Sequence, residues 1–331
     1  MKVGSLGEFG LIERIRKAAP QGRGVRAGIG DDAAWLECRG GALLVTTDLL
    51  IEGIHFDFRW TSFYALGYKT LAVNLSDIAA MGGVPDYLTL SLAVPGKYRA
   101  EDIEKFYRGL NALARKCGVS VVGGDTSAAD RLFISPALVG HSDSRPVLRR
   151  GARAGDDLYV TGTLGDSALG LALLKKKIRK TRASAAAAAH AIRRHHFPTA
   201  RLAAGALLGR TRLAQAMIDV SDGLVQDLGH ICKASGVGAE IDESALPLSR
   251  GYRLLCGGDM GAALGGGEDY ELLFAVRARD RSSIEKLSVR LGVRLTRIGR
   301  CVRGSGVKVL DRSGRVRPPS LKGYDHFKNP A

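Results

Sequence analysis

Acidic residues beside glycines recur along this sequence. The clusters are Gly30-Asp31-Asp32, Gly123-Gly124-Asp125 and Gly265-Gly266-Gly267-Glu268-Asp269. Glycine permits positive φ and a close approach of the backbone to a ligand, but aspartate and glycine are also ordinary turn formers. Turn formation would explain one such cluster. Three clusters in one chain instead indicate loops in which carboxylates and bare backbone face a charged ligand.

The aspartates with the greatest potential for chemistry fall at predicted strand ends or in predicted helices: Asp32, Asp48, Asp77, Asp125, Asp219 and Asp222. Mg²⁺ prefers hard oxygen ligands, and nucleotide enzymes hold it with carboxylates, phosphate oxygens and water. Thr46-Thr47-Asp48 offers hydroxyl and carboxylate oxygens where a strand ends. Each acid alone is more often a cap or a surface residue, but their joint spacing favours a magnesium-dependent site.

The segment Ile218-Asp219-Val220-Ser221-Asp222-Gly223 leads from an apolar strand into a helix. Ser and Asp are favoured N-cap residues, and free N–H groups at a helix start also suit a phosphate. Two aspartates at that point would need metal ions before a phosphate could bind. The sequence contains no G-x-x-x-x-G-K-[ST] loop and no H-R-D or D-F-G motif, so a kinase with this sequence belongs to neither common class.

Strands and helices alternate around these residues. Hydrophobic periodicity predicts strands over 41–48, 87–94, 119–122 and 132–140 and helices over 62–81 and 100–117. A linker-like stretch follows at 142–155. The second half has predicted strands over 157–161, 216–220 and 270–276 and helices over 166–174, 199–208 and 224–234. Mixed elements in both halves predict two α/β or α+β domains.

The bulk properties are those of a two-domain globular protein. The chain has 331 residues, of which 45% are hydrophobic, and every apolar run is too short to span a membrane. The first residues lack the apolar stretch of a signal peptide. The five cysteines are far apart and form no C-x-x-C pair, so neither a zinc site nor a disulfide framework is indicated. We expect a reduced, cytoplasmic protein without a membrane partner.

The formal net charge of +16 raises the alternative of a nucleic-acid-binding protein. The excess is local, because residues 175–201 carry nine Lys or Arg and no acid, and residues 277–303 are similarly basic. Neither block interleaves the aromatic residues that single-strand binding favours. Solvated helix faces are the preferred interpretation, and we expect no nucleic-acid partner.

The sequence resembles the thiamine-monophosphate kinase family, within the superfamily that includes aminoimidazole ribonucleotide synthetase. The resemblance extends from Gly7-Glu8-Phe9 to Lys322-Gly323-Tyr324-Asp325-His326-Phe327. The motifs that carry it are G-I-G-D-D-A-A at 28–34, T-T-D-L-L-I-E-G-I-H-F at 46–56, A-V-N-L-S-D-I-A-A-M-G at 72–82, G-G-D-T-S at 123–127, V-T-G-T-L-G-D-S at 160–167, I-D-V-S-D-G-L at 218–224 and G-G-E-D-Y-E-L at 266–272. Any one motif would be weak, but together they are highly specific.

The resemblance implies a two-domain aminoimidazole ribonucleotide synthetase-like fold of the α/β (α+β) class. Residues 1–145 would form an N-terminal domain, a mixed sheet with helices that binds ATP and Mg²⁺ and forms a homodimer. Residues 146–331 would form a C-terminal α/β domain that completes the active site. The implied reaction is the ATP-dependent phosphorylation of thiamine monophosphate to thiamine diphosphate, with several Mg²⁺ ions.

The resemblance also implies roles for individual residues. The metal positions match Asp32, Thr46, Thr47, Asp48, Asp77, Asp125, Asp219 and Asp222. The ATP contacts match Tyr107, Gly124, Asp125, Arg149 and Ser221, and the substrate contacts match His55, Glu268 and Tyr324. No protein nucleophile or base is expected, because a phosphate monoester is already largely ionised at neutral pH. Leu321 departs from the family, where many members have Trp before Lys-Gly-Tyr.

Related enzymes remain as alternatives. A selenophosphate synthetase would need an early Cys, but no Cys precedes Cys38, and a hydrogenase-maturation protein would end in a reactive Cys, whereas the last one here is Cys301. Aminoimidazole ribonucleotide synthetase lacks this pairing of G-G-E-D-Y-E-L with K-G-Y-D-H-F. The alternative of another class is a basic nucleic-acid-binding protein that has kept the fold and lost the activity.

Overall fold

The structure is a computed structural model that describes residues 7–20, 24–38, 41–178, 182, 184–311 and 313–317. The chain divides into two compact units. Of the described residues, unit 1 holds those up to Ile78 together with Gly83–Ser144, and unit 2 holds Ala79–Gly82 and those from Arg145 onward. In the described part of the chain, no helix combines the length and the apolar character needed to span a membrane.

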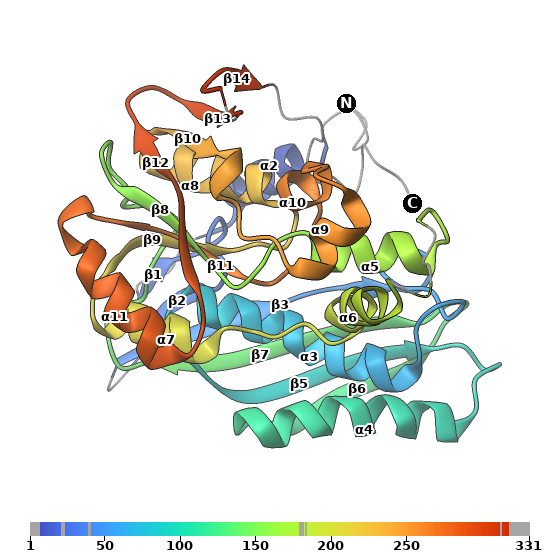
Figure 1. The fold of residues 1–331 in the computed structure, drawn as a ribbon. Helices are drawn as coiled ribbons and strands as arrows, with labels where there is room; N and C mark the ends of the chain where they lie inside the picture. The colour runs from blue at the N-terminus through green and yellow to red at the C-terminus, as the bar shows by residue number, and fades with distance from the viewer. Residues whose placement is uncertain are drawn as a thin grey trace. The chain divides into compact units, whose positions relative to one another are not determined.

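Unit 1 is built on a mixed sheet, shown with its helices in Figure 1. Its strands are β1 (Val25–Ala27), β2 (Ala34–Cys38), β3 (Gly41–Thr47), β4 (Leu50–Ile51), β5 (Val84–Val94), β6 (Ser120–Ala128) and β7 (Phe133–Ser142). They lie in the order β1-β2-β3-β7-β5-β6, with β4 paired to β7. Strands β5 and β6 are parallel, because the helix between them returns the chain to the same end of the sheet.

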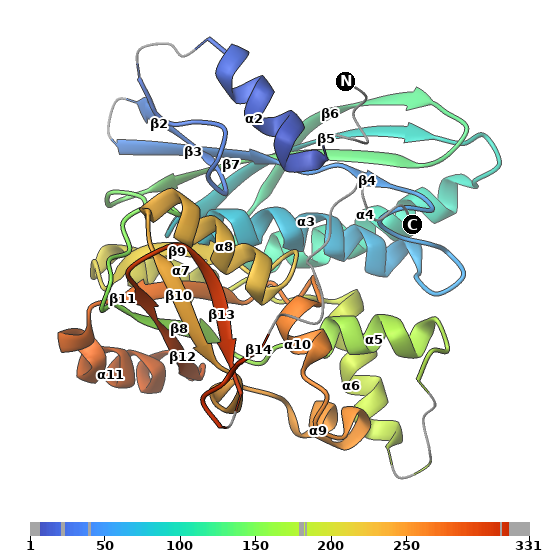
Figure 2. The same ribbon diagram turned by 90° about the horizontal axis from the view of Figure 1, so that it is seen from above.

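The helices of unit 1 are α2 (Glu8–Ala18), α3 (Phe63–Ala80), whose last two residues belong to unit 2, and α4 (Ala100–Cys117). Figure 2 shows α3 and α4 along one face of the sheet. The two helices cross at glycines: a Cβ on Gly67 would lie 1.9 Å from the carbonyl oxygen of Phe106, and one on Gly109 would lie 1.9 Å from that of Tyr64. Only glycine permits so close an approach.

Unit 2 contains a second sheet. Its strands are β8 (Asp157–Thr161), β9 (Ala214–Asp219), β10 (Gly238–Asp242), β11 (Leu272–Val276), β12 (Leu295–Val302), β13 (Gly306–Leu310) and β14 (Val316–Arg317), in the order β14-β13-β10-β12-β8-β11-β9. Strands β10 and β13 are parallel. Strands β8 and β11 are buried along their whole length, as expected when helices cover both faces of a sheet.

The helices of unit 2 lie on both faces of this sheet. They are α5 (Asp166–Leu174), α6 (Ala185–His196), α7 (Leu202–Arg210), α8 (Leu224–Ser235), α9 (Arg250–Cys256), α10 (Gly261–Gly265) and α11 (Arg281–Leu291), with short 3₁₀ turns η1 (Glu243–Ala245) and η2 (Ala278–Asp280). One core joins the sheet to α5, α6 and α8, and a second joins it to α7 and α11. Figure 1 shows α8 on one side of the sheet and α7 and α11 on the other.

The predicted fold class is therefore confirmed, with a mixed sheet and helices in the first half and α/β structure in the second. One local prediction is wrong. Gly123-Gly124-Asp125 does not form a turn after a strand but lies inside β6. The register between β5 and β6 shifts at this point, and a Cβ on Gly124 would lie 2.0 Å from the carbonyl oxygen of Leu90. Gly124 is thus needed for strand pairing, quite apart from any ligand.

Candidate active site

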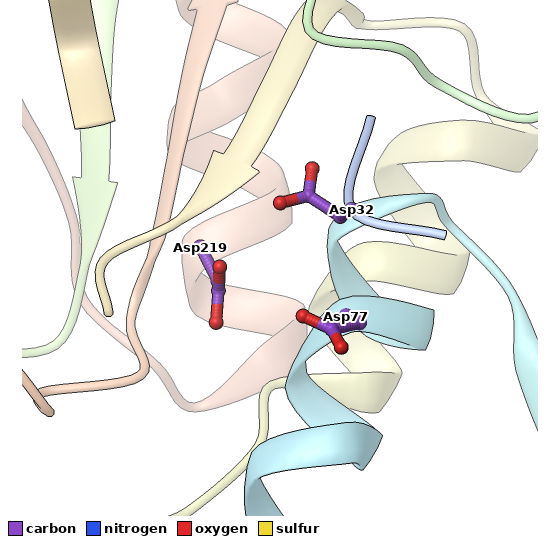
Figure 3. A group of neighbouring side chains, drawn as sticks. All are labelled: Asp32, Asp77 and Asp219. Carbon is purple, nitrogen blue, oxygen red and sulfur yellow. The ribbon is translucent and has the colours of Figure 1, made fainter. Parts of the chain in front are cut away.

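Oxygen ligands of unit 1 converge around helix α3. Asp32 lies in the loop before β2 and is 8% exposed, while Asp77 lies in the last turn of α3. One carboxylate oxygen of each lies within 4.8 Å of the other. Thr46, near the end of β3, donates from Oγ1 to Asp77 Oδ2 at 2.6 Å and so holds that carboxylate in place. Figure 3 shows Asp32 on its loop and Asp77 on α3.

The end of β3 divides the predicted threonine and aspartate ligands between two faces. Thr46 is buried and its neighbour Thr47 is exposed, because successive side chains of a strand alternate. Thr47 Oγ1 donates to the carbonyl oxygen of Pro136 at 2.6 Å, which leaves hydroxyl lone pairs to accept. Asp48 directly follows the strand and is half-buried. Thr46 therefore joins the Asp32 and Asp77 group, whereas Thr47 points away from it.

Three further predicted residues of unit 1 lie elsewhere on its surface. Asp125 is exposed in β6, where its Oδ1 accepts from the N–H of Thr126 at 2.9 Å, and Gly124 precedes it. Tyr107 lies on α4 with its ring 5.5 Å from that of Phe106. Burial raises the pKa of Tyr107, so its hydroxyl remains a neutral donor at neutral pH.

His55 follows β4 and has a defined tautomer. Its Nδ1 accepts from the backbone N–H of Ile51 at 3.0 Å, so the hydrogen of the neutral ring lies on Nε2. The same loop is held by Glu52, which accepts from the Tyr98 hydroxyl at 2.5 Å and from the N–H of Leu132 at 2.9 Å. His55 can thus present an N–H donor to an anion.

In unit 2, carboxylates gather at the start of helix α8. Asp219, labelled in Figure 3, is the last residue of β9. It is 2% exposed, and Asp222 follows in the loop. The buried carboxylate of Asp227, one turn into α8, accepts from the N–H groups of Asp222 and Gly223 at 3.1 and 3.0 Å. Burial, together with the charges of Asp222 and Asp219, raises the pKa of Asp227 well above its usual range.

This arrangement corrects the expectation of free N–H groups for a phosphate at the start of α8. Two of those donors are already bound by a carboxylate of the same helix. The crowding of Asp219, Asp222 and Asp227 instead favours a cation, since like charges in a buried place repel one another. Asp227 was missed because an acid five positions beyond Asp222 looks like an ordinary helix residue.

Arg149 lies near α8 as well. Its carbonyl oxygen accepts from Ser235 Oγ at 3.3 Å. Its charge contributes to the low pKa of His230, which burial in the first place brings down to about 4. The predicted ATP contacts Arg149 and Ser221 therefore both belong to the surroundings of α8.

The loop from Gly266 to Glu271 carries Glu268 and lies against Ser221. The N–H of Glu268 donates to the carbonyl oxygen of Ser221 at 2.7 Å. Asp269 is 1% exposed and accepts from the N–H groups of Gly165 and Ser167 at 2.6 and 3.2 Å. Burial raises the pKa of Asp269 to about 7. A predicted ATP contact and a predicted substrate contact are thus joined by the backbone.

The interpretation of the first basic block as entirely solvated is wrong at its C-terminal part. The side chain of Arg194 on α6 is 13% exposed and donates to Glu271 Oε1 at 2.8 Å. Arg201 donates to both carboxylate oxygens of the same fully buried Glu271, at 2.6 Å. These arginines were missed because their partner lies about 70 positions away in the chain. The predicted contact Tyr324, like Leu321, lies outside the described residues.

The chain is similar to known proteins over nearly its whole length. Residues 30–141 match the family model "AIR synthase related protein, N-terminal domain", and residues 153–312 match "AIR synthase related protein, C-terminal domain". Thiamine-monophosphate kinase of Bacillus subtilis is 37% identical over 97% of this chain and 99% of its own. The Escherichia coli K12 enzyme of the same name is 40% identical over 98% and 99%.

Solved structures agree with these matches. AaThiL complexed with AMPPCP and TMP has a TM-score of 0.86 and 37% identity, covering 99% of each chain. Thiamine-monophosphate kinase from Stenotrophomonas maltophilia K279a has a TM-score of 0.77 and 40% identity, covering 94% of this chain and 98% of its own. Hydrogenase-maturation proteins HypE, at 19–24% identity, share the fold. With its acidic motifs in place and relatives this similar over nearly full length, the chain belongs to the thiamine-monophosphate kinase family.

Proposed function

We propose that this protein transfers the γ-phosphoryl group of ATP to thiamine monophosphate, yielding thiamine diphosphate and ADP. The observation that carries the proposal is the near full-length similarity to thiamine-monophosphate kinases, one of whose structures is complexed with AMPPCP and TMP. A phosphate oxygen of the acceptor forms a bond to the γ-phosphorus, and the bond from that phosphorus to the bridging oxygen of ADP breaks. No covalent enzyme intermediate is needed.

The residues of this chain act by positioning and by charge. The acceptor phosphate has a second pKa near 6, so it is largely ionised at neutral pH and needs no base. The obstacle is the repulsion between two anions, and Arg149 lowers it. His55 donates from Nε2 to the acceptor, as its tautomer allows. Glu268 offers a carboxylate to the cationic thiamine moiety. In-line transfer of this kind depends mainly on orientation and electrostatic stabilisation.

The donor set of this chain suits Mg²⁺. Asp32, Asp77 and Thr46 present only oxygen atoms to a cation, and Asp32 and Thr46 are buried. Mg²⁺ takes such hard oxygen ligands. We propose that Asp32, Thr46, Thr47, Asp48, Asp77, Asp125, Asp219 and Asp222 hold several Mg²⁺ ions. Bound Mg²⁺ would neutralise phosphate charge and orient the reacting groups. Tyr107, Gly124, Arg149 and Ser221 would contact ATP, and His55, Glu268 and Tyr324 the acceptor.

We also propose a cytoplasmic homodimer. Every residue of β6 is exposed, including Val121 and Val122 at 37% and 56%, and an exposed strand edge is suited to pairing with a second copy. All five cysteines are free thiols, as a reducing compartment favours. Light scattering after gel filtration would test the dimer, and a Val122→Lys variant that stayed dimeric would argue against this face.

The decisive experiment measures ADP and phosphorylated product with thiamine monophosphate, thiamine and an aminoimidazole ribonucleotide precursor as separate acceptors. We expect turnover only with thiamine monophosphate, because the hydroxyl of thiamine is a poor nucleophile without a base. Chelation by EDTA should abolish turnover, and excess Mg²⁺ should restore it. Comparable turnover of thiamine would overturn direct transfer to a phosphate, and turnover of the precursor would point to another member of the superfamily.

A further inference from the structure

Helix α6 places His195 beside the loop that carries Glu268. His195 is 7% exposed and belongs to the last turn of α6. Its Nδ1 lies 3.1 Å from Glu268 Oε2 and 3.1 Å from Ser167 Oγ, at the start of α5. A buried histidine thus contacts a carboxylate that is partly exposed to solvent. No sequence motif predicted this contact.

A glycine brings the two helices close enough for this contact. A Cβ on Gly170 of α5 would lie 2.2 Å from the carbonyl oxygen of Ala191 and 3.1 Å from Cβ of His195. Helix α6 can therefore approach α5 only where α5 has no side chain. The approach carries the His195 ring to the N-terminal turn of α5 and to Glu268.

The chemistry of the partners determines the direction of the contact. A carboxylate only accepts hydrogen bonds, so Nδ1 of His195 carries a hydrogen, and this hydrogen is shared between Glu268 Oε2 and Ser167 Oγ. Hydrogen bonds to a charged group are stronger than those between neutral groups. The side chain of Glu268 remains 31% exposed, so its orientation is held from the protein side while part of it stays open to a ligand.

The backbone of the loop is held separately. Glu268 has φ of 68° and Tyr270 has φ of 52°, a region that non-glycine residues rarely adopt without support from their surroundings. Asp269 binds the start of α5, and Glu271 accepts from Arg194 and Arg201. These contacts secure the main chain, whereas the contact with His195 acts on the Glu268 side chain.

We propose that His195 is a positioning residue for substrate binding: it holds the Glu268 carboxylate in the orientation that receives the thiamine moiety. The inference rests on the proposed function, in which Glu268 contacts the acceptor. His195 itself is buried and takes no part in the transfer. Its effect should therefore appear in the Michaelis constant for thiamine monophosphate and not in that for ATP.

A double-mutant cycle tests this on the full-length enzyme. Loss of a hydrogen bond to a charged group should raise the KM for thiamine monophosphate at least about tenfold in His195→Leu. Glu268→Gln should raise it similarly, and the double variant should be no worse than Glu268→Gln alone. His195→Asn, whose amide can donate from nearly the Nδ1 position, should stay within about threefold of the wild type. The KM for ATP should not change in any of them.

Matched controls separate positioning from folding. His190 lies on the same helix with its side chain 52% exposed, and His190→Leu should leave both Michaelis constants unchanged. If His195→Leu melts early, the folded wild type and Glu268→Gln provide the test, because ¹⁵N NMR should show the Nδ1 resonance of His195 shifting when its charged partner is removed.

The outcomes are distinct. If Glu268→Gln leaves the KM for thiamine monophosphate unchanged, the role of Glu268 in the proposed function is wrong. If Glu268→Gln raises that KM but the effects of the two substitutions multiply, or the Nδ1 resonance does not shift, His195 does not act through Glu268. An equal rise for ATP in His195→Leu would likewise overturn the inference.

Discussion

Individual carboxylates in this chain have different surroundings, and these decide what each can do. Asp77 is held by the Thr46 hydroxyl and Asp227 by two backbone N–H groups, so both are bound within the protein. Asp125 is exposed, and its Oδ1 accepts from the N–H of the next residue. A carboxylate like Asp125 adds little to folding, so its presence is better explained by binding.

Asp125→Asn and Asp48→Asn should each abolish transfer while leaving the fold intact. The amide of Asn keeps the shape and one acceptor but loses the charge that a Mg²⁺ ligand needs. We expect kcat/KM to fall at least about 100-fold, or about 2.7 kcal/mol of transition-state stabilisation. Activity and thermal unfolding should be measured together, and a parallel loss of both would show that these residues are structural.

At the scale of elements, the effect of a glycine on stability depends on how closely its helix packs against a neighbour. Helices α3 and α4 meet at Gly67 and Gly109, where a methyl group would overlap the facing backbone. Helix α8 contains Gly229, where a Cβ would meet nothing within 4 Å. Glycine is therefore required in the crossing of α3 and α4 but not at position 229 of α8, because only the crossing brings another backbone close to it.

Gly109→Ala should destabilise the protein by about 3 kcal/mol or more, since the added methyl group forces α3 and α4 apart. Gly229→Ala is the matched control and should stabilise by up to about 1 kcal/mol, because alanine favours helix over glycine. Chemical denaturation would measure both. A neutral effect at Gly109 would contradict the close crossing.

His230 on α8 should make stability depend on pH. Burial, and then the charges of Arg149 and Lys233, lower its pKa from 6.5 to about 4. The fold therefore favours the neutral ring, and this contribution is complete above the unfolded pKa and lost as the pH falls from 6.5 towards 4. Between about pH 7 and about pH 5 the loss is about 2 kcal/mol.

Denaturation curves of the wild type and His230→Gln across this pH range would measure the effect. The difference in unfolding free energy between the two should change by about 2 kcal/mol, because glutamine does not titrate. Other groups titrate in both proteins and cancel in the comparison. Parallel curves would mean that His230 is accessible to protonation in the folded state.

At the scale of the whole molecule, the net charge of +16 is unevenly distributed. Lys175, Lys176 and Lys177 are exposed, whereas Arg194 and Arg201 are largely buried against Glu271. Part of the basic block is therefore structural, whereas the three described lysines at its start are solvated. Solvated lysines outside the acidic loops have no evident role in binding the substrates.

Replacing Lys175, Lys176, Lys177 and Lys180 by Gln should leave the Michaelis constants for ATP and thiamine monophosphate within about threefold, or about 0.7 kcal/mol. Lys180 lies outside the described residues. A rise confined to ATP would mean that this segment covers the phosphates. Filter binding to RNA across a salt series tests the nucleic-acid alternative, which requires affinity that falls steeply with salt.

Much of the chemistry could be predicted from the sequence, because it depends on residue types at short spacing. The Thr46-Thr47-Asp48 and Asp219-Val220-Ser221-Asp222 motifs identified the family, and the apolar period over 62–81 corresponds to α3, Phe63–Ala80. Such patterns are local: a helix face repeats within a few residues, and a ligand motif is contiguous. The family and the fold class followed from them.

The tertiary structure alone decided which partners the polar groups have. Arg194 and Glu271 are 77 positions apart, and Asp269 and Gly165 are 104 apart, so no local period can encode their contacts. The sequence predicted free N–H groups at the start of α8, but in the fold two of them donate to the Asp227 carboxylate. His195 reaches Glu268 only because Gly170 lets α6 approach α5. Buried polar groups must find partners wherever the packing brings them, and that packing is a property of the whole unit.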